Sequence, residues 1–245
     1  MTTKRTRLDR YISNALRINR RDVKPLLAAG RIRVNGAIAR DADLPINQFA
    51  VVIVDEQALP CVQAQYLLMN KPAGILSATK DASQRTVFAL LDAHQHADLH
   101  IVGRLDKNST GLLLLTNDGE WSRGLMAPDR HVEKTYMVSV KHAISAECVE
   151  AFARGMHFPF EDIVTLPARL EIIAPRLARV TLTEGRYHQI KRMFGRFRNP
   201  VLSLHRTRIG AIILDPAMPP GASRALLPAE LESSAVGGGG SLSRA

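Results

Sequence analysis

The chain has 245 residues, of which 46% are apolar and 23% are charged, and its net charge is +10. This length and composition are typical of a globular protein that buries its core in one large domain or in two smaller ones. They exclude a transmembrane protein, because no apolar run reaches the ~18 residues that a membrane-spanning helix needs.

The first residues and the cysteines predict a cytoplasmic protein that does not associate with membranes. The basic segment Met1–Arg7 is not followed by an apolar stretch, so we do not expect a secretory signal. Cys61 and Cys148 lie far apart and show no metal-ligand spacing, which indicates reduced thiols in a cytoplasm.

The positive charge is clustered. One group of basic residues lies between residues 4 and 40 and another between residues 186 and 208. Such clusters attract polyanions through phosphate contacts and counterion release, so nucleic acid is the expected partner. A protein that is basic without a nucleic-acid partner is the alternative, and it leaves the clustering unexplained. Because only 5% of the residues are aromatic, we expect contacts to phosphates and to shape to dominate binding.

Residues 7 to about 60 are predicted to form a small module of their own. Leu8, Ile12 and Leu16 recur at helical spacing, and a second helix is predicted over Arg21–Ala29, with Gly30 ending it. The segment 31–36 alternates like a strand and ends in Asn-Gly, a strong hairpin signal, and residues 51–54 are predicted to form another strand.

This module resembles the S4 RNA-binding domain. The resemblance depends on Arg7-Leu8-Asp9, on Leu27-Ala-Ala-Gly30 and above all on Arg31-Ile-Arg-Val-Asn-Gly36. It implies that the module holds structured RNA, and any other small basic module stays the alternative. The candidate RNA-binding residues are Arg7, Arg20, Arg21, Lys24, Arg31 and Arg33.

The rest of the chain predicts an α+β fold. Residues 60–65 look like a linker, and beyond them strands and helices follow without a repeated β-α-β rhythm, which favours a mixed, largely antiparallel sheet with flanking helices. Strands are predicted at 66–69, 111–116, 135–140, 168–173 and 179–183, and helices at 87–91, 146–154 and 187–197. The predicted domains are residues 1–62 and 63–232, followed by a flexible Gly- and Ser-rich tail at 233–245.

The segment His100–Gly119 carries the most specific chemical signal. Two apolar stretches flank a polar loop that contains Asp106 within Gly103-Arg-Leu-Asp106. By itself, an acidic residue in a loop is usually a turn or capping residue.

This loop resembles the catalytic motif of the RsuA family of pseudouridine synthases, in which Gly-Arg-Leu-Asp leads into Thr-Gly-Leu-Leu-Leu-Leu-Thr-Asn-Asp-Gly. Three further segments match the family in order, namely Met69–Gly74, Glu133–Tyr136 and Glu184–Phe194. The correspondence extends over nearly all of residues 66–231, with the S4-like module in its expected place. The resemblance therefore implies an RNA-modifying enzyme that isomerises uridine within ribosomal RNA.

The resemblance also implies roles for individual residues. Asp106 is expected to be the nucleophile or base, Tyr136 to stack on the flipped uracil, and Lys191 to pair with the catalytic carboxylate. Arg104 matches a position that fills the space left by the flipped base or contacts the RNA backbone. Family members often have Arg in place of Lys191, and Lys lacks the bidentate fork, so we expect a looser contact with Asp106.

Three further sets of residues are weighed in the same way. His188 and Gln189 are expected to bind substrate, and Asn70–Pro72 to form a turn near the pocket rim. His94, His96 and His100 could be read as metal ligands, but a fourth ligand is missing nearby, so no metal is expected. No cofactor is expected either, because the isomerisation oxidises nothing and adds no external group.

The predicted substrate is 16S rRNA in a small-subunit assembly intermediate, bound by a monomer. The runs Asn117–Ser122 and Glu133–Tyr136 favour this branch, although 23S rRNA synthases share the core motifs. Two other classes stay as alternatives. One is a non-catalytic S4-type RNA-binding or ribosome-assembly protein, and the other is a hydrolase or glycosylase with an Asp nucleophile, which would need a second acid or a metal site.

Overall fold

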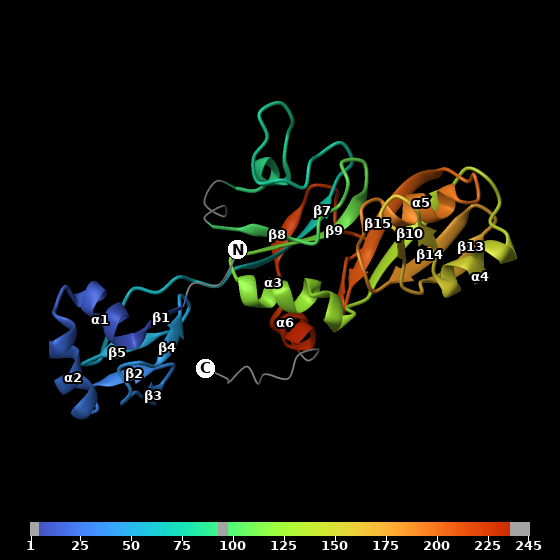
Figure 1. The fold of residues 1–245 in the computed structure, drawn as a ribbon. Coiled ribbons are helices and arrows are strands. Elements are labelled where there is room, and N and C mark those ends of the chain that lie inside the picture. The colour runs from blue at the N-terminus through green and yellow to red at the C-terminus, as the bar shows by residue number, and fades with distance from the viewer. Residues whose placement is uncertain (1–4, 93–97, 236–245) are drawn as a thin grey trace. The chain divides into compact units, whose positions relative to one another are not determined.

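The structure is a computed structural model that describes residues 5–92 and 98–235, and these fall into two compact units (Figure 1). The first contains the described residues up to Ala64 together with Asp118–Glu120, and the second contains Gln65–Asn117 and the described residues from Trp121 onward. Each unit has its own hydrophobic core.

The N-terminal unit packs two helices against short strands. Helices α1 (Leu8–Leu16) and α2 (Arg20–Ala28) bury Leu8, Ile12, Val23 and Leu27. The strands are β1 (Arg5–Arg7) paired with β4 (Pro45–Asn47), and a sheet of order β3-β2-β5-β6, with β2 at Ile32–Val34, β3 at Ala37–Ile38, β5 at Val52–Val54 and β6 at Gln57–Ala58.

The predicted Asn-Gly hairpin is present in this unit. Asn35 and Gly36 have φ of +48° and +83° and connect β2 to β3, as a two-residue turn between antiparallel strands requires. The side-chain oxygen of Asn35 accepts a hydrogen bond from the Val51 amide at 3.0 Å, which ties the turn to the segment before β5. Gly30, with φ of +69°, follows the end of α2.

The second unit is built on a nine-stranded sheet of order β13-β14-β10-β15-β9-β7-β17, with β16 beside β15 and β8 beside β9. All neighbouring strands are antiparallel except β9 and β15. The prediction of a mixed, largely antiparallel sheet is confirmed. The strands are β7 (Tyr66–Lys71), β8 (His100–Val102), β9 (Thr110–Thr116), β10 (Lys134–Val140), β13 (Arg169–Ala174), β14 (Leu177–Leu182), β15 (Val201–Ile209), β16 (Ile212–Ile213) and β17 (Ser223–Ala225).

Both faces of this sheet are covered, which explains the unbroken apolar run of β9. Leu113 and Leu115 join a core with helices α4 (Ala146–Arg154) and α5 (Gln189–Gly195) and the short 3₁₀ helix η1 (Val87–Leu90). Leu112 and Leu114 face the other core, which contacts α3 (Gly119–Met126) and α6 (Pro228–Ala235) (Figure 1). A hairpin of β11 (His157–Phe158) and β12 (Ile163–Val164), and a 3₁₀ turn η3 (Pro128–Arg130), complete the unit. No helix in the described ranges is long and apolar enough to span a bilayer.

Several expected elements differ from those observed. The predicted flexible tail from residue 233 is wrong for 233–235, which belong to α6. There the Ser234 hydroxyl accepts a hydrogen bond from the Trp121 indole at 3.0 Å and donates one to the Leu231 carbonyl at 2.7 Å. The remainder, 236–245, lies outside the described residues. Helix α5 is shorter than the predicted 187–197 at both ends: it begins only at Gln189, because His188 has left-handed backbone angles, and it ends at Gly195. The strand β15 and the helices α3 and α6 were not predicted.

Candidate active site

Asp106 lies in the loop between β8 and β9, and two glycines allow this loop to pack closely. A Cβ on Gly103 would meet the Met126 sulfur at 2.9 Å, and one on Gly111 would lie 2.3 Å from the Arg206 carbonyl oxygen. Both glycines also have positive φ, +72° and +100°. A side chain at either position would therefore strain the backbone, and one at Gly111 would also collide with the backbone of β15.

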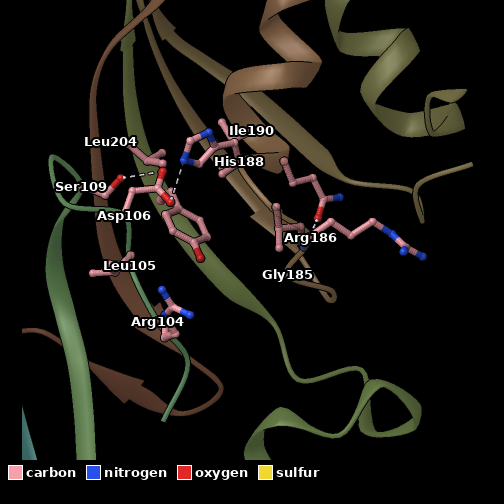
Figure 2. Close-up of a pocket in the computed structure, with 12 residues that line it drawn as sticks. Arg104, Leu105, Asp106, Ser109, Gly185, Arg186, His188, Ile190 and Leu204 are labelled. Carbon is pink, nitrogen blue, oxygen red and sulfur yellow. Dashed lines mark hydrogen bonds and ion pairs between the residues drawn. The ribbon is translucent and has the colours of Figure 1, made fainter. Parts of the chain in front are cut away.

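The Asp106 carboxylate faces helix α5. Its Oδ2 accepts a hydrogen bond from Lys191 Nζ at 2.7 Å, and Ser109 Oγ lies 3.5 Å from the same oxygen. His188 Nε2 is 3.3 Å from Oδ1. Figure 2 shows Ser109 and His188 approaching the carboxylate from opposite sides. The predicted pairing of Lys191 with Asp106 is present as a single short contact.

The carboxylate borders a cavity of about 90 Å³ that is lined by both polar and apolar residues. The apolar residues include Tyr136 on β10, Leu182 on β14 and Leu204 on β15. Tyr136 is 9% exposed, so most of its ring is packed against the protein at the sheet surface that lines the cavity. Arg104 is exposed and lines the same cavity, below Asp106 in Figure 2. A flat base could thus lie between an aromatic ring and a carboxylate.

The remaining predicted binding residues form the wall between β14 and α5. His188 lines the cavity and contacts Asp106. Gln189 also lines it, but its amide is used within the wall: Nε2 donates to Glu184 Oε1 at 2.6 Å, and Oε1 accepts from the Arg186 amide at 3.0 Å. Gln189 therefore holds this segment in place, and the Arg186 guanidinium extends away from Asp106 (Figure 2).

Lys71 was expected in a turn at the rim, and this prediction is wrong. Asn70 and Lys71 are the last residues of β7, and Lys71 is completely buried beneath the Asp106 loop. Its ammonium donates to the carbonyls of Pro72 at 3.0 Å, Lys107 at 3.0 Å and Ser109 at 2.9 Å. Lys71 thus binds the part of the loop that directly follows Asp106, through the carbonyls of Lys107 and Ser109.

Arg206 on β15 is a second support that sequence reasoning missed. It is 2% exposed, and its guanidinium donates two hydrogen bonds. One reaches the Gly103 carbonyl at the start of the loop, at 2.7 Å, and the other reaches the Leu112 carbonyl in β9, beyond the end of the loop, at 2.8 Å. Ser77 completes the support, because its hydroxyl donates to the Leu105 carbonyl at 2.8 Å and accepts from the Leu105 amide at 3.2 Å. Apart from Lys191, which was expected to pair with Asp106, the basic residues at 186–208 were interpreted as a surface for polyanions.

The two buried lysines near Arg206 make stability depend on pH. Burial lowers the pKa of Lys71 to about 8, with Asp106 opposing the shift and Arg206 adding to it. Burial also lowers the pKa of Lys134 to about 8, again with Arg206 adding to the shift. From pH 8 to 10.5 these two lysines bind more protons in the unfolded chain than in the folded one, so they should make the free energy of unfolding rise across this window and add no slope below it.

Urea denaturation between pH 7 and 10 measures this rise. Lys134→Met should remove part of this rise and stabilise the protein at pH 7 by about 1–3 kcal/mol, because the only hydrogen bond that the Lys134 ammonium donates in the described structure is a long one of 3.5 Å to the Thr183 carbonyl. A wild-type profile that is flat between pH 8 and 10 would contradict the prediction.

The predicted RNA-binding residues of the N-terminal unit fall into two groups. Arg7 forms ion pairs with Asp9, at 2.9 Å, and with Asp43, and Arg31 pairs with Asp55. Arg33 donates to the Gly36 carbonyl at 3.1 Å. In contrast, Arg20, Arg21 and Lys24 are exposed on α2 and form no ion pair within the described part of the chain.

Of the three histidines considered as metal ligands, the structure describes only His100. His94 and His96 lie outside the described residues, and His100 is on β8. Among the residues that are described, no three His, Cys, Asp or Glu side chains are grouped as metal ligands.

Comparison with known proteins identifies the family. The family described as RNA pseudouridylate synthase matches residues 65–195. The chain is 52% identical over 221 residues to the ribosomal small subunit pseudouridine synthase A of Pseudomonas aeruginosa, covering 90% of this chain and 96% of the relative. The chain belongs to the RNA pseudouridylate synthase family. The predicted family is thereby confirmed.

Other relatives agree with this membership. The ribosomal small subunit pseudouridine synthase A of Escherichia coli K12 is 39% identical over 228 residues, covering 93% of this chain and 99% of the relative. A solved crystal structure of pseudouridylate synthase has 34% identity and a TM-score of 0.68, covering 93% of this chain and 99% of that one. In the present chain the family match, over residues 65–195, includes Asp106, Tyr136 and Lys191, whereas Arg206 lies beyond the matched residues.

Proposed function

We propose that this protein isomerises one uridine to pseudouridine in 16S rRNA of the small ribosomal subunit. The observation that carries the proposal is the Asp106–Lys191 pair, at 2.7 Å, beside a cavity that Asp106 and Tyr136 both line. Relatives named for the small ribosomal subunit, at 39–52% identity, support the choice of RNA. The further expectations of a small-subunit assembly intermediate as substrate, of a monomer and of a cytoplasmic location are part of this proposal.

The reaction needs the target base outside its stack. Flipping a base costs a few kcal/mol, and stacking on an aromatic ring such as Tyr136 recovers roughly 1–3 kcal/mol. In the isomerisation the bond from C1′ to N1 breaks, the base turns, and C5 bonds to C1′. The C5 proton then leaves and N1 takes up a proton from solvent, so no electrons are gained or lost overall.

Asp106 is the group placed to drive these steps. Its carboxylate can attack C6 of the ring or C1′ of the sugar, or it can remove a sugar proton on a glycal route, and all three fit its position at the cavity edge. The Lys191 ammonium, 2.7 Å from Oδ2, holds the carboxylate in position beside the cavity. Arg104, exposed beside the cavity, can fill the space that the base leaves or contact the RNA backbone.

Tritium release from C5-labelled uridine tests the proposal. The substrates are 16S rRNA, free or in small-subunit assembly particles, and 23S rRNA as the alternative. Release from 16S rRNA alone is expected, followed by mapping of the modified uridine. Release from 23S rRNA alone would overturn the choice of RNA, and no release from either RNA would favour the non-catalytic alternative.

We also propose that the N-terminal unit holds the RNA through α2. Replacing Arg20, Arg21 and Lys24 together by Ala should weaken binding and reduce the slope of log K against log salt by about 2, since each lost phosphate contact removes about 0.7–0.9. The matched control replaces Arg154, Arg169 and Arg176, three exposed arginines of the second unit, and so removes the same charge. Equal slopes for the two triple variants, from filter binding across a salt series, would contradict the role of α2.

A further inference from the structure

A second and larger cavity adjoins the one that holds Asp106. It measures roughly 550 Å³ and is bordered by the segment Leu76–Asp81 on one side and by Gly185–His188 on the other. The two cavities share Arg104, Leu105, Asp106, Gly185, Arg186 and His188. A strand that places one nucleotide beside Asp106 therefore has room for its neighbour in the next compartment.

Tyr187 is the distinctive side chain of this second cavity. It is 74% exposed, yet one face of its ring is stacked on His188, with centroids 3.9 Å apart and planes 19° from parallel. His188 in turn contacts Asp106. A large aromatic side chain that is supported on one face and open to solvent elsewhere is a ready platform for a nucleic-acid base.

The charges around this cavity suit an RNA strand. Arg104, Lys107 and Arg186 line it, and all three are basic. Of the two acidic side chains in its lining, Asp106 is paired with Lys191, and Asp81 accepts hydrogen bonds from Ser83 and Gln84. Arg186 is paired with Glu184 at 2.9 Å, whereas Arg104 and Lys107 form no ion pair within the described part of the chain. Arg104 and Lys107 can therefore contact phosphates beside a bound nucleotide, while the ring of Tyr187 contacts its base.

We propose that this cavity binds the nucleotide next to the target uridine, in the same RNA strand, with its base stacked on Tyr187. This rests on the proposed function, because it takes the flipped uridine to lie beside Asp106. It adds a second base-binding site that would select the bases flanking the target. The alternative is that Tyr187 only supports His188 and, through it, Asp106.

Kinetics of Tyr187→Ala separate these two roles. If Tyr187 stacks on a base, KM should rise about tenfold while kcat changes less than about twofold, since stacking contributes to binding before reaction. Tyr187→Phe keeps the ring and should behave like wild type. The control is Phe160→Ala, since Phe160 is an aromatic residue that is 95% exposed and lines neither cavity. A loss in kcat with KM unchanged would overturn the proposal and assign Tyr187 to the support of His188.

Two RNAs, each with a single abasic residue on one side of the mapped uridine, identify the stacked base. At one neighbour the abasic change should raise the KM of wild type about tenfold and leave that of Tyr187→Ala unchanged. If the increase in KM caused by the abasic residue and that caused by Tyr187→Ala multiply at both neighbours, neither neighbouring base stacks on Tyr187 and the proposal fails.

A binding measurement separates this inference from the proposed function. In a short single-stranded RNA with a central uridine flanked by 2-aminopurine, wild type should quench the 2-aminopurine fluorescence and Tyr187→Ala should not. If wild type releases no tritium from any ribosomal RNA, the proposed function fails, but a quench that depends on Tyr187 still supports the second site. Equal fluorescence in the two proteins overturns it.

Discussion

Asp106→Asn is expected to lower kcat for pseudouridine formation by about 10³–10⁴-fold, in the upper range for the loss of a general acid or base. Asn has nearly the same shape, but its neutral amide can neither attack carbon nor take a proton. Lys191, which now contacts the carboxylate at 2.7 Å, would lose its ion-pair partner. The change therefore removes the reacting group without emptying the cavity.

Single-turnover tritium release with enzyme in excess measures the chemical step, and filter binding measures affinity for the same RNA. Binding by Asp106→Asn should stay within about threefold of wild type, because many phosphate contacts determine affinity. Asp129→Asn, a change at an exposed acid in η3, is the matched control and should be fully active. If Asp106→Asn keeps more than a tenth of wild-type activity, Asp106 is not the reacting residue, even though the protein is an active synthase.

Arg206→Met is expected to lower the free energy of unfolding by about 3–5 kcal/mol. The change removes two hydrogen bonds from a charged donor, each worth about 1.5–3 kcal/mol, and leaves the carbonyls of Gly103 and Leu112 without this partner. In the protein that remains folded, kcat should fall about 10²-fold, because the loop that positions Asp106 loses its attachment to β15.

Urea denaturation followed by Trp121 fluorescence gives the stability, and tritium release at low temperature, where the variant is folded, gives the activity. Arg208→Met alters an exposed arginine two residues further along β15 and should leave both unchanged. Arg206→Lys keeps a cation that reaches one carbonyl and should lie between wild type and Arg206→Met. Identical stability and kcat for Arg206→Met and Arg208→Met would show that the hydrogen bonds from Arg206 to the loop contribute neither to stability nor to the position of Asp106.

Much of the fold was predictable because its signals are local. The alternation of residues 31–36 and the Asn35-Gly36 pair specify a hairpin within a few residues. Similarly, β10 was predicted at 135–140 and found at 134–140, because alternate residues of a strand point to the same face and so give the sequence a period of two. In contrast, β15 was missed because no apolar residue lies between Leu204 and Ile209, where His205, Arg206 and Arg208 give the segment the composition of a basic cluster.

The candidate site shows the same division. By itself, the sequence determined the class of fold, the loop that contains Asp106 and the type of residue that pairs with it. It could do so because several motifs match those of one family of synthases in the same order along the chain. Only the tertiary structure showed what holds that loop. Lys71 donates to a carbonyl 36 residues away and Arg206 to one 103 residues away, and backbone carbonyls carry no residue identity that a sequence pattern could reveal. Likewise, Tyr187 became a candidate base platform only because the turn before α5 stacks it on His188.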